Sequence, residues 1–63
     1  MKIEVGMKCR LIGKGYSKYK GVVGEIEFIR VGITGKTYEV FLEVDGEPTT
    51  CYVKRENIVL VNN

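Results

Sequence analysis

The sequence predicts an all-β fold, a small barrel of five short strands. Val, Ile and Thr supply 19 of the 63 residues and alanine is absent. β-branched side chains suit a pleated sheet and lose rotamer freedom in a helix. No long stretch has the apolar spacing of an amphipathic helix. Instead, short apolar or alternating segments follow one another at intervals of about 8 to 15 residues, with turn signals between them.

The N-terminal part predicts one strand and one long loop. Residues 1–5 alternate apolar and charged side chains, which is typical of a short edge strand or a lead-in. The first strong strand is expected over residues 7–12, where Lys8 and Arg10 alternate with apolar neighbours. Residues 13–20, G-K-G-Y-S-K-Y-K, contain too little apolar surface for burial and are expected to form a loop.

The second strand is expected over residues 22–30. Glu25 and Glu27 alternate there with apolar residues. Two valines precede Gly24, which breaks the alternation, so we expect a bulge or a sharp bend at that point. Gly24 also permits a positive φ at little steric cost. A turn with two glycines, residues 31–36, is expected to follow.

The third strand, residues 37–44, has the cleanest alternation in the chain. One face carries only apolar side chains, and the other carries Glu39, Glu43 and a single aromatic, Phe41. If this strand pairs with the second, their outward glutamates form an acidic ridge or, more simply, a solvated sheet face. Two interpretations of Phe41 stay open: it packs beneath residues 13–20 or the first few residues, or it is an exposed anchor for a partner.

The C-terminal part predicts a hairpin, a fourth strand and a closing strand. Asp45-Gly46 is a hairpin turn signal, and a proline at position 48 suits the beginning of the fourth strand, residues 49–53. Residues 54–61 resemble the end of an SH3-like barrel, in which a single 3-10 turn precedes a short strand that pairs with the first. Asn62 and Asn63 are expected to fray.

A second resemblance covers roughly the first half of the chain. Residues 6–12, G-M-K-C-R-L-I, and residues 19–26, Y-K-G-V-V-G-E-I, resemble the KOW motif of ribosomal proteins and NusG-type transcription factors. The resemblance implies an SH3-like barrel with one 3-10 turn before its last strand. It also implies a binding module, because related barrels bind RNA, DNA, peptides or their own neighbouring domain. The loop at residues 13–20 is longer and more aromatic than is usual for that motif.

Alternation also predicts which side chains form the core. The expected core residues are Cys9, Leu11, Ile26, Phe28, Val40, Leu42, Val53 and Ile58. Both cysteines, Cys9 and Cys51, are expected to face inward as free thiols; a disulfide between them is the alternative, which a reducing cytosol disfavours. Sixty-three residues predict a single domain, 1–63, with limited stability.

Composition argues against catalysis and against a metal or cofactor. Histidine is absent, which removes the commonest general base near neutral pH. The two cysteines are too few ligands for a zinc site. No apolar run is long enough for a membrane span and no signal-peptide pattern is present, so we expect a cytoplasmic protein that acts without a membrane or a small-molecule substrate.

Charge is distributed unevenly along the chain. The net charge is +2, but residues 1–20 have a balance of +5 and residues 21–63 a balance of −3. The candidate binding residues are the five basic and aromatic residues of the loop together with Phe41, Lys54 and Arg55; those of the loop are Lys14, Tyr16, Lys18, Tyr19 and Lys20.

Three interpretations of the loop stay open. Its lysines neutralise phosphates while its tyrosines stack on bases, or the same tyrosines form a contact with a protein. Alternatively, the tyrosines fold back over the open end of the barrel. Lys54 and Arg55 are either solvated turn residues or an extension of the basic surface. The sequence therefore favours a non-enzymatic module that binds RNA or DNA, or associates with a ribonucleoprotein or the transcription machinery. The alternative is a protein-interaction module or small regulator that docks on a larger assembly.

Overall fold

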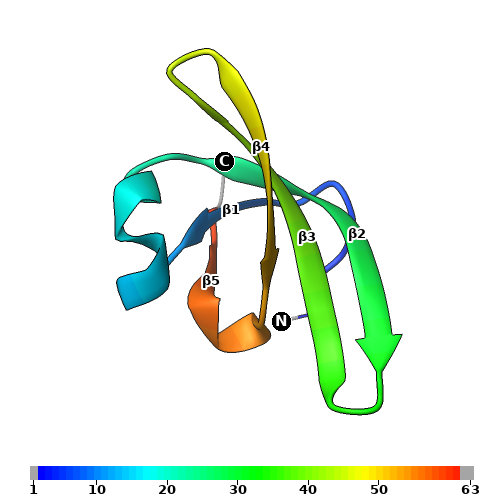
Figure 1. The fold of residues 1–63 in the computed structure, drawn as a ribbon. Coiled ribbons are helices and arrows are strands. Elements are labelled where there is room, and N and C mark those ends of the chain that lie inside the picture. The colour runs from blue at the N-terminus through cyan, green and yellow to red at the C-terminus, as the bar shows by residue number, and fades with distance from the viewer. Residues whose placement is uncertain (1, 62–63) are drawn as a thin grey trace.

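The computed structural model describes residues 2–61. Within them, seven elements follow one another (Figure 1): β1 (Lys8–Leu11), the 3-10 element η1 (Lys14–Tyr19), β2 (Gly24–Gly32), β3 (Gly35–Val44), β4 (Glu47–Val53), the 3-10 turn η2 (Arg55–Asn57) and β5 (Ile58–Leu60). All strand pairs are antiparallel, in the order β4-β3-β2-β1-β5. No helix among the described residues is long and apolar enough to cross a membrane.

These strands confirm the predicted all-β fold. The five strands form one strongly bent antiparallel sheet, with η2 directly before the closing strand and that strand paired with β1. The chain therefore has the small five-stranded barrel architecture that alternation and the tail predicted. Figure 1 shows η1 at the outside of this barrel, beside β1 and away from the β2–β3 turn.

The core lies on the inward face of the bent sheet. Seven of the eight predicted core residues are buried: Cys9, Leu11, Ile26, Val40, Leu42, Val53 and Ile58. Tyr38 and Cys51, which alternation also placed inward, are buried with them, as is Ile3 from the N-terminal segment. Both cysteines are free thiols. No charged side chain among the described residues is buried, so apolar packing holds the barrel together.

The prediction that Phe28 lies in the core is wrong. Its side chain is 49% exposed because β2 has a bulge at Glu27. Ile26 pairs with Val40, but Phe28 pairs with Glu39, so one extra residue stands in β2. Since cross-strand partners share a face, Phe28 turns outward and Ile29, opposite the buried Tyr38, takes the inward position.

The predicted bulge at Gly24 is therefore displaced by three residues, and Gly24 itself has a different role. It is not among the glycines with positive φ. Instead, a Cβ at this position would lie 2.7 Å from both the Leu42 side chain and the Phe41 carbonyl oxygen. Gly24 is buried, and it lets β2 approach β3 closely enough for the core to close.

Element ends differ from the predictions mainly at the turns. The two glycines of the expected turn at residues 31–36 pair with each other across the ladder, so only Ile33 and Thr34 form the turn. The turn at Asp45-Gly46 is confirmed, with φ of 52° and 80°. Residues 2–5 form no strand. The expectation that residues 62–63 fray lies outside the described residues.

Candidate nucleic-acid interface

The loop predicted at residues 13–20 is an ordered element. Two short 3-10 turns join at a kink at Tyr16, where φ is −121° and ψ is 19°. The Tyr16 N–H donates to the Gly13 carbonyl at 3.1 Å, and the Lys20 N–H donates to the Ser17 carbonyl at 3.2 Å. Gly13 has a φ of 107°, a conformation that is unfavourable for a residue with a side chain. The chain reverses at this residue from β1 into η1. These local bonds give the lysines a fixed backbone.

The two tyrosines of η1 fold back toward the barrel. Tyr16 and Tyr19 are both partly buried and pack against the core. The Tyr16 hydroxyl lies 3.4 Å from the Tyr52 carbonyl oxygen, to which it donates a long hydrogen bond. The Lys18 ammonium lies 5.2 Å from the centre of the Tyr19 ring, within the range of a cation–π contact. Each tyrosine therefore helps to fix η1 and exposes only part of its ring.

The lysines of η1, and Lys20 directly after it, face solvent by contrast. Lys14, Lys18 and Lys20 are exposed, as is Arg10 on the neighbouring strand. The segment 5–24 contains five cations and no carboxylate. Among the described residues, ion pairs form only between Lys8 and Glu25 at 2.8 Å and between Arg30 and Glu39 at 2.6 Å. The η1 surface, defined as Arg10, Lys14, Lys18 and Lys20, is thus exposed positive charge without carboxylate partners.

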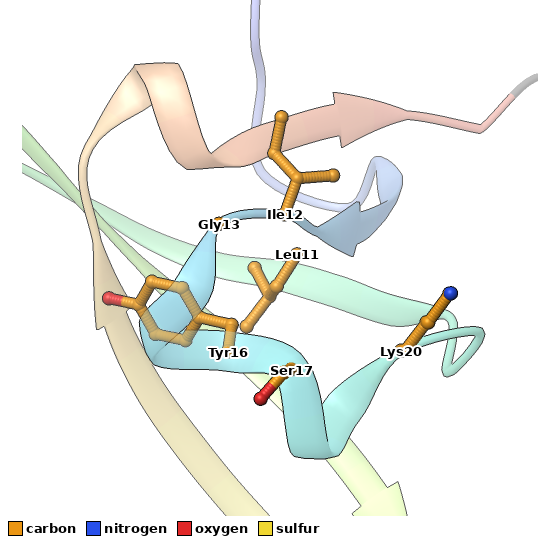
Figure 2. A pocket seen from close by; sticks show the side chains of 6 residues that line it. All are labelled: Leu11, Ile12, Gly13, Tyr16, Ser17 and Lys20. Carbon is orange, nitrogen blue, oxygen red and sulfur yellow. The ribbon is translucent and has the colours of Figure 1, made fainter.

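A pocket of about 240 Å³ opens between the end of β1 and η1 (Figure 2). Its lining residues are Leu11, Ile12, Gly13, Tyr16, Ser17 and Lys20. Figure 2 shows the Leu11 side chain directed toward η1, with the Tyr16 ring on the η1 side. One ammonium, of Lys20, and two hydroxyls, of Tyr16 and Ser17, belong to the lining residues, so the pocket is a largely apolar recess beside the positive surface.

The 3-10 turn η2 lies beside the beginning of η1. The Ile12 N–H donates to the Asn57 carbonyl at 2.9 Å. Lys54 and Arg55, the predicted extension of the basic surface, are exposed but have partners elsewhere. The Lys54 ammonium lies 3.4 Å from the Thr37 hydroxyl, and an Arg55 guanidinium nitrogen donates to the Ile58 carbonyl at 3.0 Å. These bonds direct Lys54 toward β3 and hold Arg55 within its own turn.

The outward face of β2, β3 and β4 has a different character. Phe28, Glu39 and Tyr52 stand side by side across the three strands, and Phe28 and Tyr52 are 49% and 62% exposed. Phe41 is partly buried in the next row. These four residues are the outward sheet face. Its acidic character is weakened because Arg30 pairs with Glu39 and lies 5.1 Å from the Phe28 ring.

Sequence reasoning did not select Phe28 or Tyr52 as surface residues of interest. Alternation with the buried Cys51 and Val53 was the signal that placed Tyr52 outward. For Phe28 the local sequence gave no such signal, since the bulge that exposes it depends on pairing with β3. Phe41, which was selected, does belong to the same face but is less exposed than Phe28 or Tyr52.

Residues 2–61 contain no cluster of three or more His, Cys, Asp or Glu side chains placed to hold a metal ion. Burial raises the pKa of the Cys9 thiol above its ordinary value of 9.0, because the thiolate loses its hydration. Cys9 is therefore a core residue rather than a nucleophile.

Comparison with family models, with curated proteins and with solved structures gave no match. The resemblance of residues 6–12 and 19–26 to the KOW motif therefore stays a prediction.

Proposed function

We propose that this protein is a non-enzymatic nucleic-acid-binding module whose η1 surface holds the phosphate backbone. The observation that carries the proposal is the concentration of exposed cations without carboxylate partners on η1 and the residues that flank it. The segment around them, residues 5–24, has no acidic residue that would repel a phosphate. The KOW-like residues support the same function, in association with RNA, ribonucleoprotein or the transcription machinery.

Binding of this kind depends on local charge more than on net charge. Each phosphate that a lysine neutralises releases condensed counterions, so affinity falls as salt rises. The net charge of +2 is modest, but every Asp and Glu of the chain lies outside residues 5–24. Phosphate contacts fix position without reading sequence, and η1 therefore gives the module a general affinity for nucleic acid.

The test removes two lysines from η1 and measures the salt dependence of binding to single-stranded RNA. Lys14→Ala with Lys18→Ala should flatten the slope of log affinity against log salt by about 1.4, since each phosphate contact contributes about 0.7 on a single strand. Lys20 is kept because it lines the pocket. The matched control, Lys2→Ala with Lys36→Ala, removes the same charge elsewhere and should leave the slope almost unchanged. Equal slopes in the two variants would contradict the proposal.

A second candidate function, protein interaction, is favoured by the outward sheet face. Exposed aromatic side chains such as Phe28 and Tyr52 are enriched in protein interfaces. NMR shift mapping against RNA, duplex DNA and a cell lysate fraction separates the two candidates. Shifts at Lys14 and Lys18 with nucleic acid support the first function. Shifts confined to the outward sheet face, produced by the lysate fraction alone, support the second.

A further inference from the structure

The pocket beside η1 combines features that a phosphate-binding surface does not require. Phosphate contact needs only exposed cations, yet here an apolar recess of about 240 Å³ lies beside one of them, Lys20. That volume is below the range of about 300 to 1,000 Å³ typical of sites for drug-sized ligands. The recess therefore suits one small group. Its position within the η1 surface makes that group part of an anionic partner.

The lining residues match the parts of a nucleotide. Leu11 and the Tyr16 ring provide apolar surface, against which the face of a base packs, as bases do on aromatic side chains. The Ser17 hydroxyl both donates and accepts hydrogen bonds, so it can meet the polar edge of more than one base. Lys20, also in the lining, supplies an ammonium for the adjoining phosphate. The apolar groups thus form the wall, and Ser17 and Lys20 complete the lining with their polar ends directed away from Leu11 (Figure 2).

We propose that this pocket takes one unpaired base, so that the module binds single-stranded nucleic acid in preference to duplex. The inference rests on the proposed function. In a duplex both faces of each base are stacked and its pairing edge is occupied, whereas in single strands bases splay out and stack on protein side chains. The lysines of η1 then hold the backbone on either side while the pocket holds the base.

The experiment compares strands that differ only in their bases. Fluorescence anisotropy measures binding to oligouridine RNA and oligothymidine DNA of about ten nucleotides, within the site size of small single-strand binders, each against an abasic strand of equal length and charge. The unmodified protein should bind at least one base-bearing strand about 5- to 150-fold more tightly than its abasic counterpart, as base stacking provides. The duplex of the same length should bind less tightly than the base-bearing strand, although it carries more phosphates.

A variant that fills the pocket tests whether the base binds there. Ser17→Leu should fill the recess and remove the preference for the base-bearing strand, while abasic binding and its salt slope stay the same. The control Thr34→Leu adds the same side chain at an exposed position in the β2–β3 turn, and it should keep the full preference.

Each contrary result has a distinct meaning. If the unmodified protein binds base-bearing and abasic strands equally, or binds the duplex as tightly as the base-bearing strand, the pocket inference is overturned and the proposed function stands. If Ser17→Leu keeps the preference, the base lies elsewhere and the inference is likewise overturned. If none of the strands binds, the proposed function fails and the inference fails with it.

Discussion

The η1 surface and the outward sheet face differ in how their charges are paired and in how far their aromatic rings are exposed. On η1 the lysines have no carboxylate partners among the described residues, and the tyrosines Tyr16 and Tyr19 are partly buried. On the outward sheet face Arg30 is paired with Glu39, and the rings of Phe28 and Tyr52 are exposed. One surface thus offers charge and the other offers apolar area.

This difference favours a different kind of partner for each surface. A cation that already has a carboxylate partner gains little from a phosphate, whereas an unpaired one releases counterions on contact. A ring that packs on its own core contributes to stability, while an exposed ring has its area available for a partner. The contrast therefore supports the proposal of nucleic acid at η1 and leaves the sheet face as the candidate for a protein.

Both surfaces lie on the same hydrophobic core, so truncating a core residue, Leu42→Ala, should destabilise both together. Leu42 is 1% exposed, and truncating a buried leucine costs about 2 to 5 kcal/mol. In a domain of this size the melting temperature should fall by more than about 8 °C. Thermal melts followed by far-UV and tyrosine near-UV circular dichroism should coincide. A variant that melts within a few degrees of the parent, or in two separate steps, would break the comparison.

Matched substitutions at Tyr16 and Tyr52 test whether a packed tyrosine and an exposed one contribute differently to the stability of the protein. Tyr16→Thr removes a ring that packs on the core and should lower the free energy of unfolding by about 1 to 2 kcal/mol, since only part of the side chain is buried. Tyr52→Thr keeps a residue that suits strands and removes an exposed ring, so its effect should stay within about 0.5 kcal/mol. Urea denaturation measures both. Equal losses would show that η1 does not depend on Tyr16 for its position.

The smallest effect concerns the ion pair on the sheet face. A double-mutant cycle on Arg30 and Glu39, each replaced by alanine, should give a coupling of about 0.2 to 1 kcal/mol, the range of exposed ion pairs. The coupling should shrink at 1 M salt, where the screening length is about 3 Å. A cycle on Lys8 and Glu25 is the comparison pair. No coupling in either cycle would mean that the charges on the sheet face are as available to a partner as those on η1.

Much of the architecture followed from local rules. The alternation over residues 37–44 put Val40 and Leu42 inside, because successive side chains of a strand point to opposite faces. Asp45-Gly46 predicted its hairpin turn because both residues tolerate positive φ. The tail predicted the 3-10 turn and the closing strand beside β1, which the pairing of Leu11 with Ile58 confirms.

The lysines of the candidate site were also evident from sequence, since charge and loop composition depend on the residues alone. The state of the tyrosines was not, because the sequence left open whether Tyr16 and Tyr19 form a lid, stack on bases or contact a protein. The choice depends on the distance from η1 to the core and to the edge of β4, where the Tyr52 carbonyl accepts the Tyr16 hydroxyl. The pocket could not be predicted from sequence either, because Leu11 and Lys20 line one pocket only when η1 folds against β1.

Residue types and their alternation were enough to predict the fold class, the inward positions in the regular strands and the segment that carries the unpaired cations. The face of Phe28, by contrast, depends on strand pairing. The run E-I-E-F-I-R of β2 has apolar residues at both parities beyond Ile26, so Phe28 and Ile29 suit the core equally well by local pattern. Pairing with β3 chose Ile29, because the bulge at Glu27 aligned it with the buried Tyr38. Likewise Gly24 had two explanations in sequence, and only the approach of Leu42 showed that the lack of a side chain, not a positive φ, is what the fold requires there.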